Sequence, residues 1–260
     1  MDQLLTSSRS GHIARLTLND PARYNALSLQ MIEDLIDALT CIAGQDDIRV
    51  VILAAQGKAF SAGHDLRQMV EGTEADDGAE QMRHLFDRCA TLMQLIPTLP
   101  QPVIAQVQGI ATAAGCQLVA SCDMAVAADT ARFGVNGVSL GLFCTTPMVA
   151  LTRAIPPKAA FEMLTTGDFI DATRARELGL INRTAPPDDL EAATRQLAES
   201  VAAKLPAAIR LGKAAFHRQM NQPLDVAYQG AGQTMCDNVM LPDTIEGMRA
   251  FLEKRPPDWR

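Results

Sequence analysis

The segment QPVIAQVQGIATAAGCQLVASCDMAVAA, residues 101–128, decides the fold of this chain. It opens with an apolar run, Pro102 to Val107, that predicts a buried strand, and it closes with another, Met124 to Ala128. Between them, Gly109 predicts a turn and the small residues Ala113 to Ala120 predict a helix. A strand, a glycine turn, a helix and a further strand in this order predict a layered α/β fold.

An earlier stretch repeats this order of elements. Val50 to Ala54 is a short apolar run that predicts a buried strand, and after a loop a helix is expected from Asp65. Nearer the start, Ile13 to Leu18 alternates apolar and polar residues, which predicts another strand. A helix is then expected between Ser28, as its N-cap, and a stop at Gly44. The first half of the chain therefore has the strand–helix alternation of an α/β fold.

Helical patterns dominate the second half of the chain. Asp171 is expected to cap a short helix, and Asp243 with Glu246 predicts a capping box for the last helix. We expect an α/β core over residues 1–195 and a helical oligomerisation region over residues 196–260. The remaining long helices are expected over residues 188–204, 206–219 and 223–240.

The composition argues against several classes of protein. Among 260 residues, 23 are basic and 30 acidic, and this net charge of -7 gives no electrostatic footprint for nucleic acid. The sequence shows no apolar stretch of membrane-spanning length and no features of a signal or transit peptide, so we expect a cytoplasmic protein or a processed mitochondrial matrix protein. Six cysteines without a C-x-x-C pair predict reduced, buried thiols, and four scattered histidines predict no metal site.

Two segments share a form that suits the binding of an oxyanion. AFSAGHDL (59–66) and GIATAAGCQ (109–117) each follow a predicted strand and lead through small residues into a predicted helix. Small residues let a ligand approach the backbone, and the first N–H groups of a helix lack an intrahelical acceptor. Two such N–H groups that converge on one point form an oxyanion hole. Tight packing explains either segment alone, whereas the repetition at matching places favours a ligand site.

With these segments in place, the chain resembles the crotonase-like, or enoyl-CoA hydratase/isomerase, superfamily. The resemblance runs in order along nearly the whole chain. It is carried by PARYNAL (21–27), GKAFSAGHDL (57–66), residues 101–128, FGVNGVSLGL (133–142), LTTGDFIDATRARELGLINR (164–183) and EGMRAFLEKR (246–255). It implies a crotonase-like spiral of ββα units followed by a C-terminal helical trimerisation region, assembled as a homotrimer or a dimer of trimers.

The resemblance also implies a ligand and the residues that hold it. The ligand is an acyl-CoA, a coenzyme A thioester that acts as substrate and not as a permanently bound cofactor. Its carbonyl oxygen is held by the backbone N–H groups of His64 and Ala114. Phe251 and Lys254 match a tail segment that reaches the ligand of a neighbouring subunit in the family. The other residues expected along coenzyme A are Arg23, Ala26, Leu27, Lys58, Ala62, Asp65 and Leu66.

Two departures from the family pattern concern catalysis. Hydratases of the family carry one glutamate at the position of Gln117 and another at the position of Gly137. Hydration delivers both hydroxide and a proton, so both carboxylates share in the proton transfers. A glutamine can hydrogen-bond a water molecule but cannot take its proton, and a glycine can do neither. The sequence therefore predicts against ordinary hydratase activity. If Gly137 has a positive φ, a restored glutamate there would also be strained.

Two functions remain open at this point. One is an enzyme of the lyase or isomerase class that acts on an acyl-CoA through the oxyanion hole, by decarboxylation or slow isomerisation. The other is a non-catalytic acyl-CoA-binding or assembly subunit. We expect the length of the acyl pocket to depend on a mobile segment, Glu71 to Gly78, and on the loop Leu142 to Met148. The side chains expected near the acyl group are Gln117, Asn136, Ser139, Cys144 and Thr145.

A third pattern predicts a different chemistry. Gly137 to Gly141 matches G-x-S-x-G, the nucleophile elbow of serine hydrolases, with Ser139 as the nucleophile and His217 later in the chain. The elbow requires a long preceding strand, but residues 132–136 are few and contain Gly134. A serine hydrolase is therefore the weakest of the three hypotheses. Its acidic partner would be Asp168, Asp171, Asp188 or Asp189.

Overall fold

Two β-sheets form the core of the chain in the computed structural model, which describes residues 3–259. A six-stranded sheet has the order β1-β2-β3-β5-β7-β10, and a four-stranded sheet has the order β4-β6-β8-β9. The strands are β1 (Leu5–Ser10), β2 (Ile13–Leu18), β3 (Val50–Ala55), β4 (Ala59–Ser61), β5 (Val103–Val107), β6 (Ile110–Thr112), β7 (Met124–Ala128), β8 (Arg132–Gly134), β9 (Ile170–Asp171) and β10 (Arg183–Ala185).

In each successive pair of strands from β3 to β8, the first strand belongs to the large sheet and the second to the small sheet. β3, β5 and β7 lie side by side and parallel in the large sheet, while the strands that follow each of them, β4, β6 and β8, lie parallel in the small one. Parallel strands that are buried on both faces read as continuous apolar runs, as Val50 to Ala54 does. The predicted strands are therefore confirmed, and their arrangement is the ββα spiral of the crotonase fold.

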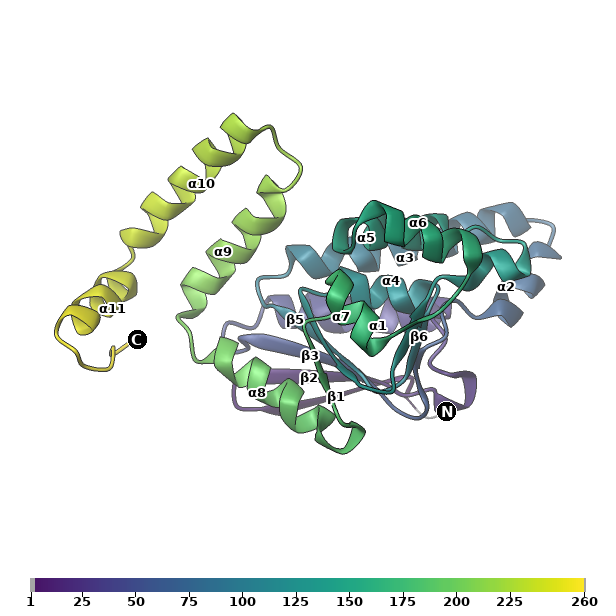
Figure 1. Cartoon of the computed structure of the whole chain (residues 1–260), viewed down its shortest axis with the longest axis horizontal. Coiled ribbons are helices and arrows are strands. Elements are labelled where there is room, and N and C mark those ends of the chain that lie inside the picture. The colour runs from purple at the N-terminus through teal and green to yellow at the C-terminus, as the bar shows by residue number, and fades with distance from the viewer. Residues whose placement is uncertain (1–2, 260) are drawn as a thin grey trace.

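Eleven α-helices lie in the described part of the chain, residues 3–259, and Figure 1 shows those of the first half packed around the sheets. The helix after Ser28 forms as expected, because the Ser28 Oγ accepts a hydrogen bond from the N–H of Met31 at 3.2 Å. The helices are α1 (Leu29–Ala43), α2 (Leu66–Thr73), α3 (Gly78–Thr98), α4 (Ala114–Ser121), α5 (Thr145–Ala154), α6 (Pro157–Thr166), α7 (Ala172–Leu178), α8 (Leu190–Ala202), α9 (Pro206–Gln219), α10 (Leu224–Val239) and α11 (Pro242–Leu252).

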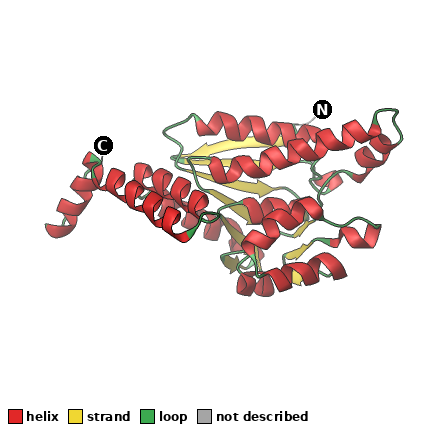
Figure 2. Cartoon of the chain, turned by 90° about the horizontal axis from the view of Figure 1, so that it is seen from above, coloured by secondary structure: helices red, strands yellow, loops and turns green. Residues whose placement is uncertain are grey.

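Helices α9, α10 and α11 form a tail that extends from one end of the core, as both Figure 1 and Figure 2 show. The expected boundary at residue 195 falls inside α8, and α8 packs against strands β2, β3, β5 and β7 of the large sheet. Since that packing buries Leu197 and Ala198, α8 belongs with the core. We therefore propose the division between α8 and α9.

An ion cluster fastens the first tail helix to the core. The buried Nζ of Lys213 on α9 donates to the Asp123 carboxylate at 2.6 Å and to the carbonyl oxygens of Ile96 and Gln101, both at 2.9 Å. The other oxygen of Asp123 lies 2.9 Å from Nε2 of His217. Burial lowers the pKa of Lys213, and the charge of Asp123 opposes that shift. A charge this deeply buried must be fully paired, so α9 cannot leave the core without cost.

Some local predictions are wrong. Glu71 to Thr73 belong to α2 and Gly78 begins α3, so the expected loop is reduced to the short connection between two helices. The capping box does not form, because α11 begins at Pro242 with Leu241 as its N-cap. The carboxylate of Glu246 instead accepts hydrogen bonds from Arg255 and from the N–H of Asp258, which fold the end of the chain back on α11.

The cysteines also differ in part from expectation. All six are free thiols, but Cys41 and Cys236 are exposed and only Cys89, Cys116 and Cys144 are fully buried. Over residues 3–259, no helix is long and apolar enough to cross a membrane. Within the same range, no three His, Cys, Asp or Glu side chains are grouped so that they could hold a metal ion.

Candidate functional site

The two small-residue segments meet where the small sheet ends. β4 and β6 pair in parallel, with Ala59 opposite Ile110, so the turns that follow them lie together. A Cβ added to Gly63 would lie 2.9 Å from the Cβ of Ala113 and 3.1 Å from the nitrogen of Ala114. A Cβ on Gly115 would overlap the backbone of the first segment in the same way. Glycine is needed at both places because the two backbones touch.

Each of these turns presents one backbone N–H that is unused within the described residues. The N–H groups of His64 and Ala114 have no hydrogen-bond acceptor there. Ala114 is the first residue of α4, so its N–H points out of the positive end of the helix dipole. Both predicted oxyanion donors therefore lie on adjacent backbones with their hydrogens free to bind a ligand.

The turn before α4 is strained. Ala113 has φ 50° and ψ -121°, a conformation that is essentially reserved for glycine. Its N–H donates to the carbonyl oxygen of Gly134 at 3.0 Å, which helps to hold it in place. Strain of this kind costs on the order of 1–3 kcal/mol and persists at functional sites. Ala113 is thus a strained residue between the two turns that the sequence did not reveal, since an alanine carries no signal of a positive φ.

A cavity of about 250 Å³ opens beside these N–H groups. Eight of the expected site residues line it, namely Ala62, His64, Leu66, Ala114, Asn136, Gly137, Cys144 and Thr145. Gln117 and Ser139 do not. The other lining residues are Met69, Phe86, Thr112, Ala113, Leu140, Leu142, Phe143, Thr146 and Pro147. The segment from Leu142 shapes the pocket as expected, whereas α2 contributes through Leu66 and Met69 and not through residues 71–78.

Gln117 lies just behind the cavity on α4. Its side chain is only 5% exposed, and its Oε1 is buried without a hydrogen-bond partner among the described residues. A buried amide oxygen that lacks a donor costs about 1–3 kcal/mol. Gln117, where the resemblance leads us to expect the first glutamate of the family's hydratases, is therefore a group that accepts hydrogen bonds but takes no proton.

Gly137, where the resemblance leads us to expect the second glutamate, has no room for a side chain. Gly137 does not have a positive φ, so the expected backbone strain is absent. The obstacle is steric, because a Cβ on Gly137 would lie 2.7 Å from Sγ of Cys144 and 2.7 Å from the carbonyl oxygen of Leu142. Burial raises the pKa of the Cys144 thiol, partly offset by a hydrogen bond from the N–H of Gly137. A neutral thiol thus lies in the space that a side chain at position 137 would enter.

The side chain of His64 has one satisfied and one unsatisfied nitrogen. Its Nδ1 lies 3.2 Å from the carbonyl oxygen of Leu27, while Nε2 is buried and has no partner among residues 3–259. The ring packs edge-on against Phe86, with ring centroids 5.4 Å apart. Burial lowers the pKa of His64 from its ordinary value, so the ring is neutral at neutral pH.

A second polar pair in the cavity is fixed by its own hydrogen bond. The hydroxyl of Thr112 donates to Oδ1 of Asn136 at 2.6 Å. The amide nitrogen of Asn136 is thereby oriented as a donor to whatever occupies the cavity. Thr112 was not expected from the sequence, because its role depends on the pairing of β6 with β8.

Residues 21–27, which are expected to lie along coenzyme A, contact the turn that carries His64. The N–H of Leu27 donates to the carbonyl oxygen of Gly63 at 2.7 Å, and the N–H of Ala62 donates to that of Tyr24 at 3.0 Å. The buried Asn25 anchors the segment, since its Nδ2 donates to the carbonyl oxygens of Gln56 and Ala59, both at 2.8 Å. Residues 21–27 and 59–66 therefore form one continuous surface.

The expected coenzyme A residues differ in how they face this surface. Arg23 is exposed and pairs with Asp20 at 2.9 Å and with Asp65 at 3.7 Å. The side chains of Ala26 and Leu27 are buried, so only their backbone is available to a ligand. The other exposed members of the set on this surface are Lys58, Ala62 and Leu66.

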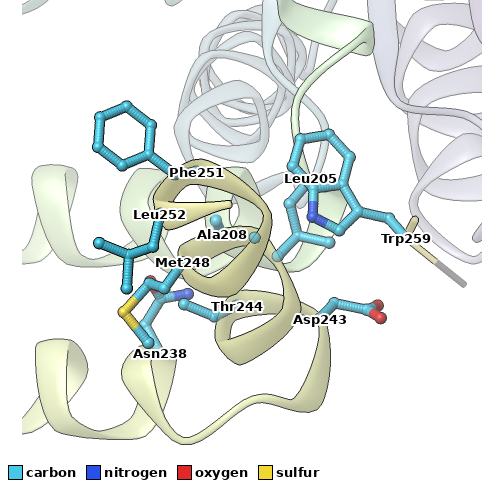
Figure 3. A pocket seen from close by; sticks show the side chains of 10 residues that line it. Leu205, Ala208, Asn238, Asp243, Thr244, Met248, Phe251, Leu252 and Trp259 are labelled. Atoms are coloured by element: carbon cyan, nitrogen blue, oxygen red, sulfur yellow. The ribbon is translucent and has the colours of Figure 1, made fainter. Parts of the chain in front are cut away.

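Phe251 and Lys254 lie far from this cavity, in the tail. Phe251 is exposed, and it borders a separate hollow of about 540 Å³ between α9, α10 and α11, whose lining Figure 3 shows. The other residues around that hollow are Leu205, Ala208, Asn238, Asp243, Thr244, Gly247, Met248, Leu252 and Trp259. Neither Phe251 nor Lys254 lines the acyl cavity of its own chain.

The geometry does not support the serine-hydrolase hypothesis. Ser139 lies in a 3-10 helix, Asn136–Leu140, and not at a sharp turn from a strand to an α-helix. His217, the expected base, is bound to Asp123, which is none of the four expected acidic partners. The required pairing of serine, histidine and acid is therefore absent from the described residues.

Comparison with known proteins agrees with the spiral fold. The sequence profile described as enoyl-CoA hydratase/isomerase matches residues 8–260. The chain belongs to this family. It is similar to the mitochondrial enoyl-CoA hydratase domain-containing protein 3 of Mus musculus, with 45% identity over 98% of this chain and 84% of that protein. A putative enoyl-CoA hydratase of Thermus thermophilus shares 38% identity, over 95% of this chain and 97% of its own length.

Solved structures of the family superimpose closely on the chain. An enoyl-CoA hydratase of Mycobacterium smegmatis has 49% identity and a TM-score of 0.96, and 99% of each chain is covered. Human enoyl-CoA hydratase domain-containing protein 3 has 41% identity and a TM-score of 0.94, with 99% of this chain and 100% of that chain covered. These comparisons confirm the resemblance inferred from the sequence.

Proposed function

We propose that this chain binds an acyl-CoA and holds the thioester oxygen between the backbone N–H groups of His64 and Ala114. The observation that carries the proposal is that both N–H groups lack an acceptor among the described residues and border one cavity. A thioester oxygen placed there would satisfy both, and it would gain further as charge develops on it in an enolate.

The chemistry of the cavity favours an uncharged acyl group. None of its lining residues is Asp, Glu, Lys or Arg, and apolar side chains such as Met69 and Phe86 form much of the wall. A carboxylate buried there would have no counter-charge, which is strongly unfavourable. Slow proton transfer on a simple acyl chain is therefore a better fit than decarboxylation of an acyl group that carries a carboxylate.

Ordinary hydration is not part of the proposal. Gln117 cannot take a proton, and a side chain at position 137, where the resemblance implies the second glutamate, would collide with Cys144 and Leu142. The lack of a proton-accepting group at these two positions also favours the second candidate function, a non-catalytic acyl-CoA-binding or assembly subunit. A screen for turnover of several acyl-CoAs, run beside the binding measurement, separates the two.

Calorimetric titration with butyryl-CoA tests the binding. We expect a dissociation constant of about 1 μM, or about -8 kcal/mol. Replacing Arg23 by alanine should weaken binding, because an exposed guanidinium beside the coenzyme A surface is placed to contact phosphate. Arg9→Ala is the matched control, since Arg9 is also ion-paired, to Asp47, but lies on β1 away from the cavity. Absence of binding to the wild-type protein would contradict the proposal.

We further propose that the tail makes a homotrimer or a dimer of trimers and delivers Phe251 and Lys254 to a neighbouring subunit. The support is a set of apolar side chains on the tail that the single chain leaves uncovered, including Phe251, which is 82% exposed. Light scattering at micromolar concentration tests it, and a stable monomer would contradict it. The other exposed apolar residues of the tail are Phe216, Met220, Leu224, Val226, Tyr228, Met235, Val239, Met240, Met248 and Leu252.

A further inference from the structure

The acyl cavity contains a proton acceptor that the family resemblance does not assign. Its titratable side chains are His64 and Cys144, and the remaining polar ones, such as Asn136 and Thr145, do not accept a proton at neutral pH. Burial raises the pKa of Cys144, so its thiolate is scarce. Burial lowers the pKa of His64, so its imidazole is present as the free base.

Hydrogen bonding fixes which nitrogen of His64 is basic. A backbone carbonyl can only accept a hydrogen bond, so Nδ1, at 3.2 Å from the Leu27 oxygen, carries the proton. The lone pair then belongs to Nε2, which is buried and has no donor among residues 3–259. Packing alone does not account for an imidazole here, because leaving a buried acceptor unpaired is unfavourable and an apolar ring could make the same edge contact with Phe86.

We propose that His64 is a catalytic base that removes a proton from the carbon next to the thioester carbonyl. This inference rests on the proposed binding of an acyl-CoA. The C–H bond breaks, its proton moves to Nε2, and its electron pair forms a C=C bond as the carbonyl becomes an enolate oxygen. That oxygen is held by the N–H groups of Ala114 and of His64 itself. Return of a proton from the imidazolium regenerates the acyl-CoA, so no other reactant is consumed.

One residue would therefore supply both a donor to the enolate oxygen and the base that forms the enolate. The two functions come from different atoms, the main-chain nitrogen and Nε2, so a side-chain substitution removes only the second. The imidazolium formed in the step also lies in the same cavity as the enolate, where opposite charges stabilise each other more strongly than in water.

Exchange of deuterium into the α-carbon of butyryl-CoA in D₂O, followed by NMR, tests the proposal. Wild-type protein should catalyse the exchange, and His64→Gln should lower its rate by about 100-fold or more, the usual contribution of a general base. Glutamine keeps the backbone N–H and can still form hydrogen bonds but cannot take the proton. His84→Gln is the matched control, because His84 lies exposed on α3, and it should exchange as wild type does.

The pH dependence distinguishes a base from a residue that only positions the substrate. Exchange should be constant at neutral pH and should fall as pH drops through the lowered pKa of His64, since protonation removes the lone pair. Calorimetry on the same samples keeps the two proposals apart. Binding without any exchange overturns the role of His64 and leaves the proposed function standing, as does exchange that persists in a folded, binding-competent His64→Gln. No binding at all overturns both.

Discussion

The two sides of the proposed acyl cavity differ in whether the groups expected from the family are present. On one side, the turns that carry His64 and Ala114 keep two unused N–H groups, although this requires a strained Ala113 and close backbone contact at Gly63. On the other side, Gln117 and Gly137 stand where the family resemblance leads us to expect carboxylates, and Cys144 occupies the space beside Gly137. Strain persists only where the surrounding structure enforces it. The contrast is the one expected of the proposed function, in which the chain binds an oxyanion but does not use the acid–base pair of the family's hydratases.

The largest effect expected from this contrast concerns hydration. Wild-type protein should hydrate crotonyl-CoA more slowly than a family member with both glutamates, by about 10²- to 10⁴-fold for loss of one acid–base group. The two losses need not multiply, because the roles are coupled. Loss of absorbance of the conjugated thioester measures the rate. A rate equal to that of such a family member would show that another group, with His64 as the first candidate, performs the proton transfers.

A smaller loss of activity is expected when one of the two proposed oxyanion donors is removed. Ala114→Pro removes one oxyanion donor and should lower α-deuterium exchange by about 10²- to 10³-fold. Proline is well tolerated at the first position of a helix, so α4 should still form. Leu224→Pro makes the same change at the first position of the exposed helix α10 and should leave exchange unchanged. Equal exchange in all three folded proteins would show that this N–H does not face the developing charge.

Introducing a glutamate at position 137 should lower the stability of the protein. Gly137→Glu forces a side chain against Cys144 and the Leu142 carbonyl, so the free energy of unfolding should fall by about 1–3 kcal/mol. Adding Cys144→Ala should recover part of this loss, since it removes one of the two contacts. Gly232→Glu is the control, because nothing lies within 4 Å of a Cβ there. Urea unfolding measures all four proteins.

The outcome of that measurement also decides how hydration is tested. If Gly137→Glu unfolds like wild type, the segment around Leu142 yields more easily than the contacts indicate, and the steric interpretation is wrong. The double variant Gln117→Glu with Gly137→Glu would then be expected to hydrate crotonyl-CoA faster than wild type. If it is destabilised, Cys144→Ala must be included before the kinetics are measured.

The smallest effect is expected at the strained turn. Ala113→Gly relieves a φ of 50°, so the free energy of unfolding should rise by about 1 kcal/mol or less once the greater freedom of glycine in the unfolded chain is counted. Thermal unfolding measures the difference. A loss of stability would mean that contacts of the Ala113 methyl group, such as the one near Gly63, outweigh the strain.

Much of the fold could be predicted because local patterns determine it. The buried runs at Val50 to Ala54 and Met124 to Ala128, and the caps at Ser28 and Asp171, act within a few residues of themselves. The capping box at Asp243 and Glu246 failed for the opposite reason. Glu246 is engaged by Arg255, nine positions later, and a long-range partner of this kind leaves no local signal.

For the site, sequence determined the residue types and tertiary structure determined what they can do. The chain alone shows two small-residue turns, a glutamine and a glycine where the resemblance implies carboxylates, and a histidine in the first turn. Only the folded chain shows that Cys144 fills the space beside Gly137 and that the carbonyl of Leu27 leaves Nε2 of His64 as the free base. The physical reason is that sterics and hydrogen bonding act between atoms that the fold brings together from distant parts of the chain, whereas the sequence shows only neighbours along it.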